Sequence, residues 1–177
     1  PSDGLVLTYD DIEYSKSLGT TAKYPRHSIA FKWKDETQIT ILRNVEWQTS
    51  RTGLINPIAV FDTVELEGTE VSRASLHNLS IIEGLELGLG DEILVYKANM
   101  IIPQIAGNLT KSNTLEYPKY CPVCNSKSEV VKSNEVKYLY CTNDLCKAKL
   151  LKRLVLFTSR NAMNIEGLSD AILDRFI

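Results

Sequence analysis

Residues 38–47 read "QITILRNVEW" and show the pattern that recurs through the first part of the chain. Ile39, Ile41 and Val45 stand among polar residues at a period close to two, which is typical of a strand with one buried face. Glycine- and proline-containing turns separate this stretch from further short runs rich in β-branched residues. These runs lie at 58–66, 91–98 and 100–107. The pattern therefore predicts a small β barrel or sandwich.

One short helical stretch interrupts the strands. Residues 75–83, "SLHNLSIIE", predict a helix after the third strand. Three strands, a helix and two strands form the element order of an OB-fold barrel, an architecture that often binds nucleic acids. We therefore expect a mainly β chain with an OB-fold barrel, while composition alone also leaves other small barrels open.

The hydropathy of the chain and the residues at its two ends indicate what class of protein it belongs to. No apolar run approaches the length of a membrane span, and no basic-then-apolar leader is present. We therefore expect no membrane partner and a cytoplasmic protein. The residues at 1–4 lead at once into an apolar run, and the last residues carry no tail. We expect the chain to be a piece of something longer.

Charge is unevenly distributed. Residues 111–160 contain ten Lys or Arg and four Asp or Glu, a balance of +6, whereas the remaining residues contain ten basic and eighteen acidic side chains, a balance of −8. A basic block beside acidic neighbours indicates a polyanionic partner such as nucleic acid. A solvated helix face together with a basic metal-binding module would give the same balance.

All the cysteines of the chain follow the pattern C-x2-C-x16-C-x4-C, at Cys121, Cys124, Cys141 and Cys146. Zn²⁺ takes four such ligands at the corners of a tetrahedron, and the strand-like residues around Asn134 predict a hairpin that brings the second pair back to the first. Two disulfides are the alternative, which the missing secretory signal disfavours. Four thiolates leave no open coordination position, so the pattern predicts a structural zinc site.

The C-terminal part is predicted to be helical. Apolar residues within 148–160 recur at helical spacing with basic residues between them, after a polar linker at 110–118. Residues 164–177 predict a turn followed by a helix. We expect the inward face of that helix to carry Ala171, Ile172 and Phe176.

An ordered set of segments resembles the bacterial NAD-dependent DNA ligases. In chain order they read "SLGTTAKYPRHSIAFKW", "QTSRTGLINPIAVFDTVELEGTEVSRASLHN", "GDEILVYKANMIIPQI", the four cysteines and "TSRNAMNIEGL". The resemblance implies four parts. These are the end of an adenylation domain (1–36), an OB-fold domain (37–110), a four-cysteine zinc finger with its linker (111–150) and the start of a helix–hairpin–helix domain (151–177).

The resemblance also implies an activity. The family seals nicks in double-stranded DNA during replication and repair, with NAD⁺ as the AMP donor and Mg²⁺ at the reacting phosphates, and we expect a monomer. The family's nucleophilic lysine lies in a Lys-x-Asp-Gly motif. Asp3 and Gly4 match a later motif instead, in which Thr8 stands at the usual lysine. The chain alone is therefore expected to lack the adenylated lysine and to be inactive.

Individual site residues follow from the same resemblance. Lys32 of "AFKW" matches a lysine that contacts phosphate and is the catalytic candidate. The candidates for DNA binding lie in "SRTG" and "KANMIIP" and are Arg51, Thr52, Lys97, Ile101 and Ile102. From the residues alone, Lys32 could instead be a solvent-facing strand lysine, and the two isoleucines could belong to the barrel core.

The chain departs from the family at a few positions. Ser50 replaces a glycine, and Asn99 and Met100 replace Gly-Asp. With Thr8, these departures support an alternative function, a non-catalytic OB and zinc-ribbon module that binds nucleic acid in a divergent ligase-like protein.

Overall fold

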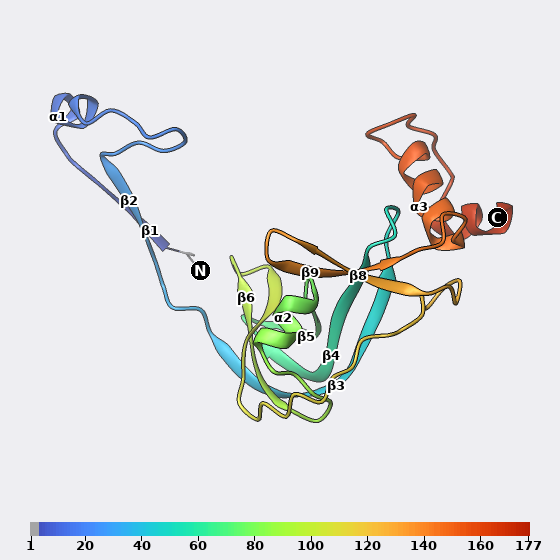
Figure 1. Ribbon diagram of the computed structural model, residues 1–177. Helices are drawn as coiled ribbons and strands as arrows, with labels where there is room; N and C mark the ends of the chain where they lie inside the picture. The colour runs from blue at the N-terminus through green and yellow to red at the C-terminus, as the bar shows by residue number, and fades with distance from the viewer. Residues whose placement is uncertain (1–3) are drawn as a thin grey trace.

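The computed structural model describes residues 4–177 (Figure 1). Its centre is a five-stranded antiparallel sheet, preceded by one two-stranded hairpin and followed by another hairpin and helices. Asp3, half of the Asp-Gly match, lies outside the described residues. The fold is mainly β with short helices, as the sequence predicts.

The central sheet is an OB-fold barrel. Its strands are β3 (Thr37–Thr49), β4 (Ile55–Leu66), β5 (Thr69–Ser75), β6 (Glu92–Ala98) and β7 (Ile102–Asn108). They pair in the order β5-β4-β3-β6-β7, and the two edge strands also contact each other. That contact curls the sheet into a barrel. The helix α2 (Leu79–Gly84) lies between β5 and β6 in the chain, which confirms the predicted order of elements.

The barrel is held together by side chains from alternating strand positions. Leu42, Ile55, Phe61, Ile93 and Val95 are all buried, and α2 adds Leu79 and Ile82 to the same cluster. Each large aliphatic side chain removed from water contributes about 1.5–3 kcal/mol. The inner face of β3 differs from the face that the sequence pattern indicates, because Ile39 is 57% exposed whereas Thr40 and Leu42 are buried. An irregularity in the β3–β4 register between Leu42 and Asn44 shifts the alternation, so that Val45 again points inward.

The helix predicted at 75–83 begins later than expected. Ser75 is still paired with Ile58 in the sheet, and α2 starts only at Leu79. Asn78 is the N-cap, and its side chain accepts a hydrogen bond from the Ile81 amide at 3.1 Å. A short polar side chain that caps free amides fixes the start of a helix, so the sequence prediction was wrong by four residues at this end.

The second module contains the predicted hairpin. Strands β8 (Ser128–Ser133) and β9 (Val136–Cys141) pair antiparallel, and the turn residues Asn134 and Glu135 both have positive φ. Two consecutive left-handed residues are the signature of a type I′ hairpin turn. The hairpin expected around Asn134 is therefore confirmed.

Three short helical elements end the chain. They are α3 (Lys147–Thr158), α4 (Asp170–Leu173) and the 3-10 turn η1 (Asp174–Phe176). Leu173 is buried, whereas 74% of Phe176 is exposed, so the predicted inward face was wrong. Ser169 caps α4, and the chain tightens into η1 after one turn. The helical face that the prediction assumed therefore does not continue.

The N-terminal elements stand apart from the barrel. Strands β1 (Gly4–Thr8) and β2 (Ser28–Lys32) form an antiparallel pair, and α1 (Ile12–Ser17) lies between them in the chain. Figure 1 shows this hairpin extending away from the barrel. Apolar side chains on both strands are exposed, namely Leu5, Val6, Leu7, Ile29 and Phe31.

A buried carboxylate fastens the segment expected to be a linker. Asp91 is 1% exposed, and its Oδ2 accepts hydrogen bonds from the Gly88 amide at 2.8 Å, the Asn108 side chain at 2.7 Å and the Ser112 amide at 3.3 Å. Burial raises the pKa of Asp91, but the hydrogen bonds from Ser112, Asn108 and Gly88 together outweigh it and lower the pKa. The Leu115 amide also donates to Leu87. The expected linker is thus tied to the barrel as far as Leu115.

Replacing Asp91 tests this attachment. Asp91→Asn should lower the free energy of unfolding by about 2 kcal/mol at neutral pH, because an amide leaves part of this buried donor set unpaired. The folded-state pKa of Asp91 lies below its unfolded value of about 3.9, so its contribution is present above about pH 4 and is lost as the pH falls through the folded pKa. Urea unfolding followed by circular dichroism should show that the difference in unfolding free energy between variant and wild type becomes smaller in acid.

Asp10→Asn is the matched control, since Asp10 is exposed. It should leave the free energy of unfolding unchanged at both pH values. If the loss of unfolding free energy caused by Asp91→Asn stays the same as the pH falls, the ionised carboxylate of Asp91 does not stabilise the fold.

Candidate metal centre and nucleic-acid interface

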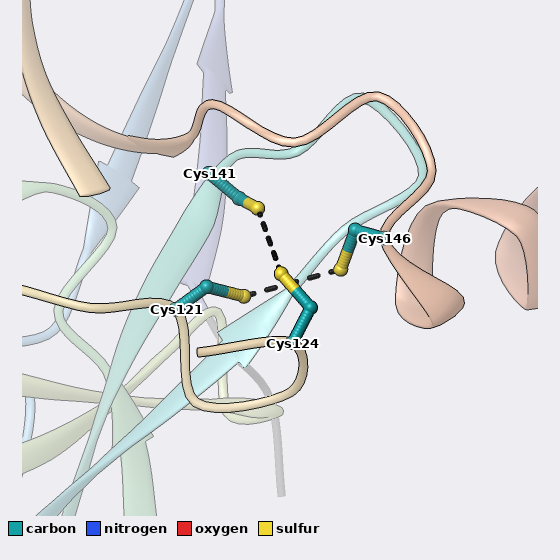
Figure 2. Close-up of side chains that lie close together, drawn as sticks. All are labelled: Cys121, Cys124, Cys141 and Cys146. Carbon is teal, nitrogen blue, oxygen red and sulfur yellow. Dashed lines mark hydrogen bonds between the residues drawn. The ribbon is translucent and has the colours of Figure 1, made fainter. Parts of the chain in front are cut away.

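The four cysteines meet at one point, as Figure 2 shows. Their sulfur atoms all lie within 4.8 Å of one another, with Cys121 and Cys146 3.9 Å apart and Cys124 and Cys141 3.5 Å apart. Tetrahedral ligands at a Zn–S distance of about 2.3 Å lie about 3.8 Å from each other. A disulfide needs about 2.05 Å, and all four thiols are free. The arrangement fits a zinc site with four cysteine ligands.

Local backbone geometry places these ligands. The Cys121 amide donates to Ser126 at 2.8 Å and the Asn125 amide to Cys121 at 3.0 Å, with Asn125 in the left-handed region, which closes the first loop. Cys141 is the last residue of β9, and Cys146 is the N-cap of α3. The hairpin and the helix start therefore deliver the second pair.

The thiols influence one another's ionisation. Burial raises the pKa of Cys124, but hydrogen bonds from Ser126 and the neighbouring thiols outweigh it and lower the pKa to about 6. Burial and the nearby sulfurs raise the pKa of Cys141 to about 12, against a hydrogen bond from the Asn143 amide. Four thiolates this close repel each other, and a divalent cation among them would offset that repulsion. Bound zinc supplies folding free energy on the order of 10 kcal/mol to such a module.

The cysteine module is joined to the barrel at the turn between β3 and β4. The Cys141 amide donates to the Gly53 carbonyl at 2.9 Å, and Leu54 forms an isolated β-bridge with Tyr140. Thr49, at the end of β3, places its hydroxyl 3.4 Å from the sulfur of Cys121. The turn is thus part of both units.

That turn presents two of the predicted DNA-binding residues. The Ser50 amide donates to Leu54 at 2.8 Å, the Gly53 amide donates to Ser50 at 3.0 Å, and Gly53 has a φ of +91°. Between them Arg51 and Thr52 are exposed. An exposed arginine on a fixed backbone is suited to a phosphate. Contact of Arg51 and Thr52 with DNA stays a prediction, which their exposure favours.

The turn between β6 and β7 presents the predicted apolar pair. Asn99 and Met100 have φ of 53° and 61°, and the Ile101 amide donates to Ala98 at 3.2 Å, as in a type I′ turn. Ile101 is 75% and Ile102 52% exposed. The alternative that these isoleucines belong to the barrel core is therefore wrong, while their contact with DNA stays a prediction.

Lys97, unlike the two isoleucines, points into the barrel. It alternates with Ile93 and Val95 on the inner face of β6, is 5% exposed, and donates to the hydroxyl of Thr69. Its ammonium therefore has a partner inside the barrel. A DNA contact of Lys97 stays a prediction that this burial does not favour.

The catalytic candidate Lys32 reaches the barrel. It is exposed, and its Nζ donates to Oδ1 of Asn99 at 3.0 Å. The structure thus brings Lys32 close to the turn that carries Ile101, while Arg51 and Thr52 lie on the other hairpin. Thr8, at the position of the family's motif lysine, uses its hydroxyl within the N-terminal hairpin by donating to the His27 carbonyl at 3.3 Å.

The sequence did not indicate two residues that lie beside the metal centre, Thr49 and Lys149. Thr49 could have been noted as an inward position at the end of a predicted strand. Lys149 is buried beneath the β3–β4 turn, and no local pattern distinguishes it from the other lysines of α3.

Comparison with known proteins agrees with this architecture. The family described as the NAD-dependent DNA ligase OB-fold domain matches residues 39–116. Residues 39–116 belong to the family of NAD-dependent DNA ligase OB-fold domains. The match covers most of the barrel and the segment fastened by Asp91, so the sequence-based resemblance to bacterial ligases is confirmed.

Relatives named DNA ligase extend the similarity over the whole chain. It is 63% identical to the protein of Ruminiclostridium cellulolyticum and 62% identical to that of Lachnoclostridium phytofermentans, each over 100% of this chain. The protein of Petrotoga mobilis is 43% identical over 99% of this chain. The chain spans 27% of the length of each of these relatives. Within residues 4–177, no helix is long and apolar enough to span a bilayer.

Metal analysis of the purified protein should find about one zinc per chain. Removing it with a chelator, or replacing Cys124 by Ser, should loosen the β8–β9 hairpin and lower the melting temperature. The barrel has its own core and should keep its β circular dichroism. Two disulfides and no metal in the purified chain would contradict the zinc site.

Gly53 tests the close approach between the turn and the module. A Cβ atom on Gly53 would lie 2.4 Å from Cε of Lys149, whereas one on Gly68, which also has positive φ, would meet nothing within 4 Å. Gly68→Ala should therefore lower the free energy of unfolding only by the conformational strain, about 1 kcal/mol. Gly53→Ala should lower it by at least about 2 kcal/mol, because the contact with Lys149 adds to the strain. Urea unfolding of the zinc-loaded chain measures both, and equal losses would show that the approach is not tight.

Proposed function

We propose that this chain is the part of an NAD-dependent DNA ligase that grips nicked double-stranded DNA. One observation carries the proposal: the barrel presents a cationic turn at Arg51 and an apolar turn at Ile101 and Ile102, both exposed. These turns join the first two and the last two barrel strands, and the corresponding loops bind oligonucleotides in other OB folds. In Figure 1 both hairpins extend toward the upper side of the barrel.

Each turn suits a different part of a duplex. Arg51 would pair with backbone phosphate, with Thr52 as a further hydrogen-bonding group. Ile101 and Ile102 would press into the minor groove, where apolar side chains deform a duplex. The charge of +6 over residues 111–160 favours the same polyanion. The zinc site would hold the cationic turn in place.

The whole protein would seal nicks during replication and repair. Its nucleophilic lysine would take AMP from NAD⁺ and release nicotinamide mononucleotide, and the AMP would then pass to the 5′-phosphate of the nick. The 3′-hydroxyl would displace that AMP as the phosphodiester forms, with Mg²⁺ shielding phosphate charge. Lys32 would contact a reacting phosphate, because its ammonium is exposed and its bond to Asn99 can be exchanged for one to an anion. We further propose a cytoplasmic monomer.

The chain alone should not accept AMP, because its 177 residues contain no Lys-x-Asp-Gly motif. An AMP adduct on this chain after incubation with NAD⁺ and Mg²⁺ would contradict that assignment.

A non-catalytic binding module is the second candidate. The hydroxyl of Thr8 is hydrogen-bonded to His27 and supplies no ammonium for phosphate chemistry. Reading the residues that precede Pro1 in the gene separates the two functions: a Lys-x-Asp-Gly motif there supports an active ligase, and its absence supports the module.

Binding of the zinc-loaded chain to a nicked duplex, measured by fluorescence anisotropy, tests the interface. Arg51→Ala should weaken binding about 5- to 10-fold, because one phosphate contact is lost. The slope of log affinity against log salt concentration, measured between about 50 and 200 mM salt, should become shallower by about one. Ile101→Ser with Ile102→Ser should weaken binding without changing the salt dependence, because no charge is removed.

Arg43→Ala is the control for the arginine. Arg43 lies on β3 itself rather than in the turn, and its guanidinium is paired with Asp62 at 2.8 and 2.6 Å. Its loss should leave DNA affinity near that of the wild type. Equal effects of the two arginine variants would count against a specific role of the turn.

A further inference from the structure

Lys149 is a buried lysine in an unfavourable position. The residue is 5% exposed and lies in the first turn of α3. Its Nζ is 3.5 Å from Oδ1 of Asp144, but the side chain of Asp144 is 96% exposed. An ion pair with so hydrated a partner compensates a buried ammonium poorly. The helix dipole also disfavours a cation at this end, and the first turn of α3 has no acidic residue.

A negative group next to this helix start would offset both effects. The helix begins directly after Cys146, as Figure 2 shows, and the amides of Lys149 and Ala148 hydrogen-bond the sulfur of Cys146. Four thiolates around one divalent cation retain net negative charge. The buried ammonium and the cysteine centre therefore complement each other in charge.

The other side of Lys149 faces the barrel. A Cβ atom on Gly53 would lie 2.4 Å from Cε and 2.9 Å from Nζ of Lys149, and 3.3 Å from the carbonyl oxygen of Cys141. The end of the lysine thus lies directly against the β3–β4 turn. The same turn is hydrogen-bonded to Cys141 and exposes Arg51.

We propose that Lys149 is a positioning residue that couples the metal centre to the DNA-facing turn. Its ammonium balances the charge of the thiolate centre, and its buried stem supports Gly53 and so fixes the direction of Arg51 toward a DNA phosphate. The DNA part of this inference rests on the proposed function, whereas the coupling between metal and turn does not.

Zinc retention tests the charge balance. Lys149→Met keeps most of the stem and removes the charge, and Lys152→Met removes a charge from an exposed position of the same helix. With excess chelator, Lys149→Met should release zinc several-fold faster than the wild type, and Lys152→Met at the wild-type rate. Equal release from Lys149→Met and the wild type would overturn the charge balance.

A double-mutant cycle on nicked-duplex affinity tests the coupling to Arg51. If Lys149 acts through the turn, the variant that combines Arg51→Ala with Lys149→Met should bind about as weakly as Arg51→Ala alone. The combination of Arg51→Ala with Lys152→Met should instead be additive. Additive losses for the Lys149 pair, or full DNA affinity of a zinc-loaded Lys149→Met chain, would overturn the proposal.

A measurement on the unaltered chain covers the case in which Lys149→Met does not fold or hold zinc. Amide hydrogen exchange is compared before and after chelation. Removing the metal should lower protection of the amides of Gly53 and Cys141 and leave the β6–β7 pairing protected, and unchanged protection at the turn would overturn the coupling. If Arg51→Ala leaves DNA affinity unchanged, the proposed DNA contact fails, while zinc release and exchange still decide the role of Lys149.

Discussion

The hydrogen bond from the Cys141 amide to the Gly53 carbonyl is the contact on which the functional architecture depends. It joins the strand that delivers a metal ligand to the barrel turn that carries Arg51. Glycine suits this position, because its φ is +91° and a Cβ atom there would displace the end of the Lys149 side chain. The hydroxyl of Thr49 next to Cys121 adds a second link to the same centre. A module too small to build a large core thereby acquires a fixed position against one that has a core.

The two exposed turns of the barrel are stabilised by different means. The β3–β4 turn adds long-range contacts with the cysteine module to its own hydrogen bonds, whereas the β6–β7 turn is shaped by its own type I′ geometry at Asn99 and Met100. Loss of metal should thus affect only the cationic turn. The bond between Lys32 and Asn99 gives the second turn a polar partner from the N-terminal hairpin.

Sequence reasoning succeeded where the signal is local. Strand periodicity predicted the barrel strands, although it placed Ile39, which is exposed, on the buried face of β3. The spacing of the four cysteines predicted the ligand cluster, and the strand-like residues around Asn134 predicted the hairpin. It failed at the start of α2, where a capping Asn78 outweighed an apolar pattern, and at the last helix, where Phe176 faces outward. It also missed the burial of Lys97 and Lys149. A lysine is assigned to the surface by its chemistry, and only the packing of distant segments shows that it lies inside.

The closure of the barrel has a consequence for Ile101 and Ile102. An apolar pair beside an unpaired strand would invite another chain to add to the sheet. Here β6 and β7 are paired up to the tip, and β7 lies against β5, the other edge strand. The apolar side chains therefore lie at the tip of a paired hairpin on a curled sheet rather than along a flat open edge, an arrangement that lets them be exposed with a lower hazard of self-association.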